Sequence, residues 1–142
     1  MSTATYPLKT VGSSLRTIVP IMIINPIGHK VLKTFALVDT GADACAFPEN
    51  IATNTGHNLK GVGVISNVST GIGGVNVPTW KHTFTIGLLD PTAKNVLKWS
   101  ASTLLVDCFE HNNCPPLLGS SDFLKDFKIT IDYPNKTMTL EW

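Results

Sequence analysis

One nonapeptide carries most of the information in this chain, the run Phe35-Ala36-Leu37-Val38-Asp39-Thr40-Gly41-Ala42-Asp43. Its first four residues are apolar and predict a strand, which would hold the following carboxylate on a rigid support. Gly41 lacks a Cβ, so the backbone can make a tight turn directly after Asp39. A carboxylate placed by an apolar strand onto a glycine turn suits acid–base chemistry.

The centre of this run resembles the active-site loop of retropepsin-like aspartic proteases, because an apolar pair precedes Asp39-Thr40-Gly41 and Ala42-Asp43 follows it. The resemblance implies that Asp39 is the catalytic carboxylate and that Thr40 and Gly41 complete the active-site loop. It also implies that Ala42 and Asp43 lie against the substrate, and that the Thr40 hydroxyl bonds across to a neighbouring chain. The alternative is a structural aspartate in an ordinary β-turn, which the flanking residues disfavour.

The chain supplies only half of such a site. An aspartic protease needs two carboxylates that share one proton, and the sequence holds one Asp-Thr-Gly and no Asp-Ser-Gly. We therefore expect a homodimer in which each chain gives one Asp39 across a two-fold axis. The length of 142 residues predicts a single domain over residues 1–142 and suits one subunit of this family.

A glycine-rich run, Ser69-Thr70-Gly71-Ile72-Gly73-Gly74-Val75, is the second informative element. Phosphate-binding glycine loops lead into a helix, whereas residues 75–80 here are strand-like. The run therefore predicts a mobile hairpin tip, with an ordinary turn as the alternative. Retropepsin-like enzymes cover the bound peptide with such a flap. The resemblance implies a role in substrate binding for Gly71, Ile72, Gly73 and Gly74. Apolar side chains here would suit apolar substrates.

A third element, Pro116-Leu117-Leu118-Gly119, resembles the hydrophobic-hydrophobic-Gly segment that packs beneath the catalytic loop in this family. The resemblance makes Leu117, Leu118 and Gly119 structural support, with Gly119 letting the backbone pack close to the Asp39 loop. Some relatives carry an arginine after this glycine, where it ties down the second acid of the loop. Here Ser120 follows, so Asp43 lacks that partner.

The remaining pattern predicts an all-β chain with one short C-terminal helix. The resemblance implies a retropepsin-like acid protease subunit with a closed β-barrel-like sheet and a flap hairpin. That helix is expected near Ser121 to Phe127, capped by Ser120 or Ser121. Residues 50–60 are polar and leave open a turn of helix or a loop. The sequence also predicts strands over residues 17–24, 33–38, 44–48, 61–69, 75–87 and 103–106.

The C-terminus predicts a hairpin. Residues 128–133 and 137–142 both alternate polar and apolar side chains, and Pro134-Asn135-Lys136 supplies the turn. Such a hairpin exposes strand edges that need a cover. A dimer partner is one way to provide it.

Composition excludes several other classes. Charged residues make up 15% of the chain and the net charge is +1, which gives nucleic acid no basic patch to bind. No apolar run is nearly long enough to span a membrane, and the N-terminus lacks the pattern of a signal peptide. We therefore expect a cytoplasmic chain or a piece released from a larger precursor. No cofactor is expected.

The cysteines predict neither a disulfide framework nor a metal site. Cys45, Cys108 and Cys114 are too few for a disulfide-rich domain, although a Cys108–Cys114 pair stays open for an oxidising compartment. Cys108, His111 and Cys114 could in principle bind zinc, but the spacing favours an ordinary loop.

Together these elements predict an aspartic endopeptidase that acts as a homodimer on peptide or protein substrates. A non-catalytic dimeric β-domain that keeps the retropepsin-like fold to bind peptides is the first alternative. A small-molecule or carbohydrate-binding β-barrel with a structural Asp39 is the second.

Overall fold

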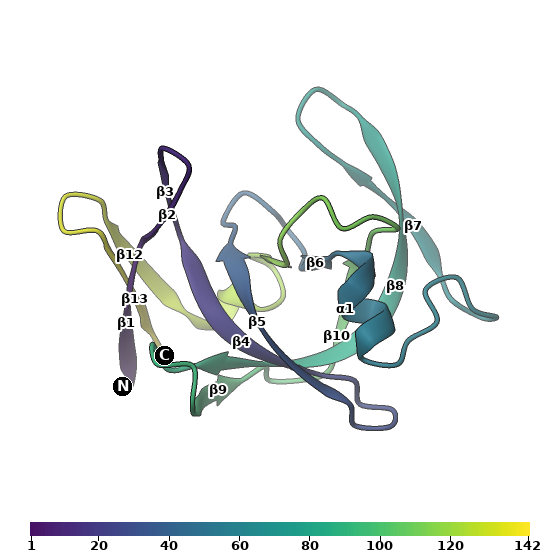
Figure 1. The fold of residues 1–142 in the computed structure, drawn as a ribbon, viewed down its shortest axis with the longest axis horizontal. Helices are drawn as coiled ribbons and strands as arrows, with labels where there is room; N and C mark the ends of the chain where they lie inside the picture. Colours follow the sequence, from purple (N-terminus) through teal and green to yellow (C-terminus); the bar gives the residue numbers. More distant parts are fainter.

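The computed structural model describes residues 1–142 and consists mainly of strands (Figure 1). The strands are β1 (Thr3–Pro7), β2 (Lys9–Val11), β3 (Ser14–Arg16), β4 (Ile18–Ile24), β5 (Val31–Val38), β6 (Ala46–Phe47), β7 (Ser66–Thr70), β8 (Asn76–Leu89), β9 (Val96–Trp99), β10 (Leu104–Cys108), β11 (Leu117–Leu118), β12 (Lys128–Asp132) and β13 (Thr137–Glu141). One α-helix, α1 (Glu49–Asn54), and one 3-10 turn, η1 (Leu124–Asp126), complete the fold. The all-β prediction is confirmed.

The main sheet is ring-like. Its strand order is β10-β6-β11-β5-β4-β8-β7, β9 pairs with β8, and β8 also pairs with β10, so the pairings return to their start. Strand β8 makes this possible because it is 14 residues long. Its residues 80–84 pair with β10, and its residues 85–88 pair with β4.

The core lies inside this ring and follows the two-residue period of the strands. Val19, Ile21 and Ile23 of β4 are fully buried, as are Phe84 and Ile86 of β8. Alternate side chains of a strand point to one face, which accounts for the two-residue spacing of these buried residues. The apolar inner face fixes the register of β4 against β8, because a one-residue slip would turn these side chains outward.

A second sheet joins the two ends of the chain in the order β1-β13-β12. Strands β12 and β13 form the expected C-terminal hairpin, in which Ile129 lies opposite Leu140. Strand β1 pairs with the other side of β13, placing Ala4 opposite Leu140. The chain therefore covers the β13 edge of the hairpin with its own strand β1, rather than with the dimer partner that the sequence analysis offered as one cover. The edge of β12 remains open.

The helices differ from expectation. The helix expected over residues 121–127 is only the 3-10 turn η1, and neither Ser120 nor Ser121 caps it. The physical reason is length: Phe127 is already extended and leads into β12, so there is no room for the several turns that offset the cost of starting a helix. Helix α1 covers the start of the polar segment at 50–60, where the sequence left open a turn of helix or a loop, and it buries Ile51 and Ala52. No helix is long and apolar enough to cross a bilayer.

Candidate active site

The backbone before Asp39 is clamped on both sides. Val38 donates from its N–H to the Thr17 carbonyl at 2.8 Å, and the Thr17 hydroxyl donates to the Val38 carbonyl at 2.9 Å. Asp39 donates from its own N–H to the Leu118 carbonyl at 3.1 Å. Three hydrogen bonds therefore fix the backbone that carries the Asp39 side chain.

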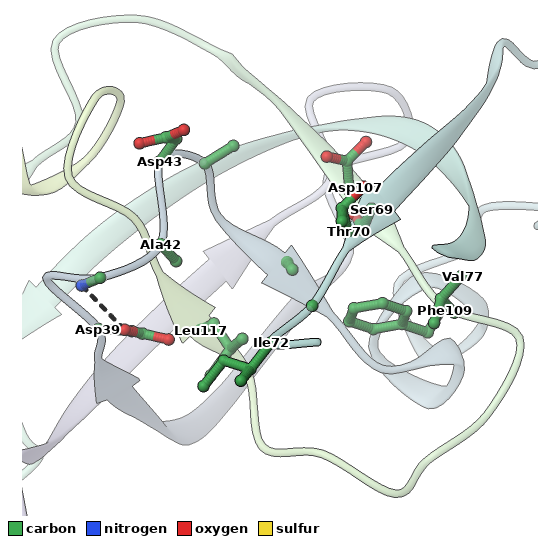
Figure 2. Close-up of a pocket in the computed structure, with 14 residues that line it drawn as sticks. Asp39, Ala42, Asp43, Ser69, Thr70, Ile72, Val77, Asp107, Phe109 and Leu117 are labelled. Carbon is green, nitrogen blue, oxygen red and sulfur yellow. Dashed lines mark hydrogen bonds between the residues drawn. The ribbon is translucent and has the colours of Figure 1, made fainter. Parts of the chain in front are cut away.

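The Asp39 side chain is oriented by the turn that follows it. The Gly41 N–H donates to Oδ1 of Asp39 at 3.1 Å (Figure 2). The Ala42 N–H donates to the Asp39 carbonyl at 3.2 Å. No hydrogen bond reaches Oδ2, and the residue is half-buried. One carboxylate oxygen is thus held by the backbone while the other is free for chemistry.

Strand β11 supports the loop from below. Leu117 lies opposite Leu37 of β5 and opposite Ala46 of β6, so β11 sits between the strands that enter and leave the loop. Gly119 follows and passes against the backbone of Ala44. Two bonds extend this contact, because the Ser120 N–H and hydroxyl both donate to the Ala42 carbonyl, at 2.8 and 3.0 Å.

Asp122 is a supporting residue that the sequence analysis did not identify. Its Oδ2 accepts the Cys45 N–H at 2.8 Å, and its Oδ1 accepts the Cys45 thiol at 3.2 Å and the Phe123 N–H at 2.6 Å. Burial raises the pKa of the Cys45 thiol well above its usual range, so the sulfur keeps its proton and donates. The one available signal was an aspartate at the start of a helical turn, where it commonly caps free N–H groups.

A pocket of about 580 Å³ opens between the Asp39 loop and the β7–β8 hairpin (Figure 2). Residues from both sides line it: Asp39, Gly41, Ala42, Asp43, Ala44, Ala46, Ser69, Thr70, Gly71, Ile72, Val77, Asp107, Phe109 and Leu117. Six of the residues expected at the active site therefore share one cavity: Asp39, Gly41, Ala42, Asp43, Gly71 and Ile72. Leu118 and Gly119 lie behind the wall, where both are buried.

The β7–β8 hairpin projects from the body of the fold (Figure 1). Its strands pair from Ser66 opposite Trp80 to Thr70 opposite Asn76, and the tip closes when the Gly71 N–H donates to the Val75 carbonyl at 2.9 Å. Gly73 and Gly74 have φ of +85° and +78°, the left-handed region that favours glycine. They form the exposed tip and do not line the pocket.

Two of the expected residues have polar side chains without a hydrogen-bond partner in the chain. Thr40 is exposed and its hydroxyl makes no hydrogen bond within the chain. Asp43 is exposed, and its carboxylate also has no partner, although the Ser121 N–H donates to its carbonyl at 2.8 Å. Both polar side chains are therefore available to another molecule.

Asp107 and Phe109 line the pocket and were missed by the sequence analysis. Asp107 is in β10, opposite Lys81 of β8 and Ala46 of β6. No local motif marks either residue, because each reaches the pocket through pairings between segments more than 20 positions apart. All three cysteines are free thiols, and no group of three His, Cys, Asp or Glu side chains is placed to hold a metal.

Solved structures match this fold, and one of them covers nearly the whole chain. A retropepsin-like aspartic protease from Rickettsia conorii superposes with a TM-score of 0.61 and 18% sequence identity, covering 98% of this chain and 92% of that one. No protein-family model matches the chain, and a search of curated proteins finds no significant match. The chain thus has a retropepsin-like fold. A structural similarity at 18% identity supports the fold alone.

Proposed function

We propose that this chain is an aspartic endopeptidase that works as a homodimer, with one Asp39 from each chain. The observation that carries the proposal is the position of Asp39. It ends a clamped strand, lies on a glycine turn, and lines a pocket bounded on the other side by a projecting hairpin. In a retropepsin-like fold, this is the arrangement that a water-activating carboxylate requires.

Dimerisation completes the site in this proposal. Two carboxylates about 3 Å apart cannot both stay ionised, because two charges at that distance repel by roughly 5 kcal/mol at an effective dielectric near 20. The two Asp39 side chains therefore share one proton. The ionised one takes a proton from the bridging water, and the protonated one donates to the scissile carbonyl oxygen. They exchange roles when the amide nitrogen leaves.

Two further features support a dimer. The Thr40 hydroxyl has no partner in its own chain and lies next to Asp39, where it would meet its symmetry mate. The open edge of β12 offers unpaired backbone groups to a second chain. In the same proposal the β7–β8 hairpin is a flap. Its closure over a bound peptide would exclude water and bring the Gly71 to Gly74 backbone to the substrate.

The test is cleavage of a mixed peptide library near pH 5, read by mass spectrometry, for wild type and Asp39→Asn. The asparagine keeps the size of the side chain and removes proton exchange, so cuts should be present in wild type and absent in the variant. Asp126→Asn, at an exposed carboxylate outside the pocket, is the matched control and should cleave as wild type does. Equal cleavage by Asp39→Asn would overturn the mechanism. No cleavage by a demonstrated dimer would point to a peptide-binding domain instead.

A further inference from the structure

Asp107 lies across the pocket from Asp39 in Figure 2 and is not used by the mechanism above. It belongs to β10 and is paired directly with Lys81 of β8 and Ala46 of β6. Only 7% of the residue is exposed. A carboxylate so deeply buried needs charge and hydrogen-bond partners.

Those partners all gather on one oxygen. Oδ1 of Asp107 accepts from the Lys81 ammonium at 3.0 Å, the Thr79 hydroxyl at 3.3 Å and the Asn67 amide at 3.3 Å. Oδ2 accepts nothing from the chain. No fully enclosed side-chain oxygen or nitrogen lacks a hydrogen-bond partner, so Oδ2, which has none, keeps some exposed surface. Asp107 lines the pocket and therefore has one carboxylate oxygen without a partner in the chain.

All the charged side chains that line the pocket are acidic. Its walls contain Asp39, Asp43 and Asp107 and no lysine, arginine or histidine. Lys81 neutralises one of the three carboxylates from outside the wall, which lets Asp107 stay buried without a ligand. Phe109, Val77 and Ala46 line the same cavity and give it apolar surface.

We propose that Asp107 is a specificity-determining residue that selects peptides carrying a lysine or arginine side chain, whose cationic end binds the free Oδ2. This inference rests on the proposed endopeptidase function. The aliphatic stem of such a side chain would lie along the apolar wall while its head reaches the carboxylate. A hydrogen bond between two charged groups is shorter and stronger than a neutral one. An acidic side chain in this subsite would meet only like charges on the wall.

The test uses a peptide library in which one position at a time carries lysine, norleucine or glutamate. At the position that occupies this subsite, wild type should cleave the lysine peptide at least about tenfold faster in kcat/KM than the norleucine peptide, and the glutamate peptide most slowly. A tenfold ratio corresponds to about 1.4 kcal/mol of transition-state binding. Asp107→Asn should reduce the ratio of lysine-peptide to norleucine-peptide kcat/KM to within about threefold.

Lys81→Met separates recognition from structure. This variant keeps the charge of Asp107 and removes its ion-pair partner, so the preference for lysine peptides should persist or increase. If Asp107 had only a structural role, Lys81→Met and Asp107→Asn would both lose activity on every peptide to the same extent. Thermal unfolding of each variant is the control that tests whether it is folded. Equal cleavage of lysine and norleucine peptides by wild type at every position would overturn the inference and leave the endopeptidase intact.

A binding measurement distinguishes the two proposals. Fluorescence anisotropy with Asp39→Asn, which binds without cutting, should show tighter binding of labelled lysine peptide than of norleucine peptide, and loss of that difference in Asp39→Asn with Asp107→Asn. If wild type cleaves nothing but this difference is present, the endopeptidase proposal fails and the role of Asp107 in recognition stands. Absence of the difference contradicts the role of Asp107.

Discussion

Gly119 and Ala44 lie in direct backbone contact. A Cβ added to Gly119 would stand 2.3 Å from the carbonyl carbon of Ala44 and 2.6 Å from its Cα. No side chain fits there, because non-bonded carbon atoms pack about 3.5–4.0 Å apart. Beside this contact the Ser120 N–H binds the Ala42 carbonyl at 2.8 Å. The absence of one methyl group thus lets the segment after β11 hold the end of the Asp39 loop.

Gly119→Ala should destabilise the protein by about 3 kcal/mol, since an extra carbon forces two backbones apart. Urea unfolding followed by circular dichroism measures it. Gly71→Ala is the control, because its Cβ would meet nothing nearer than the Val75 carbonyl oxygen at 3.9 Å, and its stability should change by less than about 1 kcal/mol. Equal stability of Gly119→Ala and wild type would contradict the contact.

Asp122→Ala should cost about 2 kcal/mol of stability, because hydrogen bonds to a charged group are among the stronger ones. The variant leaves the Cys45 N–H and the Phe123 N–H without their acceptor. Cys45→Ala keeps the backbone bond to Asp122 but removes the thiol, which donates to Asp122 and accepts the Gly119 N–H. It should cost less than Asp122→Ala if the backbone bond dominates. A double-mutant cycle over the two positions should give a coupling energy above about 0.5 kcal/mol. Additive effects would show that Asp122 and Cys45 do not interact.

Alkaline pH should destabilise the fold through its buried thiols. Burial, followed by the charge of Asp107, raises the pKa of Cys108 to about 12, and burial raises the pKa of Cys45 in the same direction. The unfolded chain releases these protons near pH 9, whereas the folded chain keeps them. Stability is therefore full below that pH and falls as the pH rises from about 9 toward 12, by up to about 1.4 kcal/mol per pH unit for each thiol.

Urea unfolding at several pH values from 8 to 10 measures this slope. Only at the upper limit does Tyr6, whose pKa burial also raises, begin to add its own proton release, because an unfolded tyrosine titrates near pH 10. Cys108→Ala retains Cys45 and Cys114, whose pKa burial also raises, and should show a shallower slope than wild type. A wild-type stability that stays constant across this range would contradict the prediction.

Thr40→Val should weaken the proposed dimer, because it replaces an exposed hydroxyl beside Asp39 with a methyl group of similar size. We expect the dissociation constant of the dimer to rise about tenfold or more. On dilution, the variant should therefore lose its activity per chain at a higher protein concentration than wild type does. Analytical ultracentrifugation measures the first and peptide cleavage the second. Thr40→Ser keeps the hydroxyl and should behave almost as wild type. Full activity from a demonstrated monomer would exclude the dimeric site.

Local signals in the sequence indicated most elements of the fold. The apolar run into Asp39, the glycine cluster at 71–74 and the alternation after residue 128 each predict their structure from neighbouring side chains alone, and β5, the β7–β8 hairpin and the β12–β13 hairpin are observed there. The helix near 121–127 was predicted from a capping serine and spacing, but the chain needs those residues to reach β12. Strand β1 was not predicted, because its pairing partner β13 lies at the other end of the chain.

The sequence by itself determined that Asp39 follows a strand on a glycine turn and that one chain carries one such loop, because both depend on residues adjacent along the chain. Only the tertiary structure decided what surrounds that carboxylate. Asp107 and Phe109 reach the pocket through the pairing of β10 with β6, and Asp122 reaches Cys45 across 77 positions. Such contacts depend on the register of a ring-like sheet, which the whole set of buried side chains fixes together and no single motif encodes.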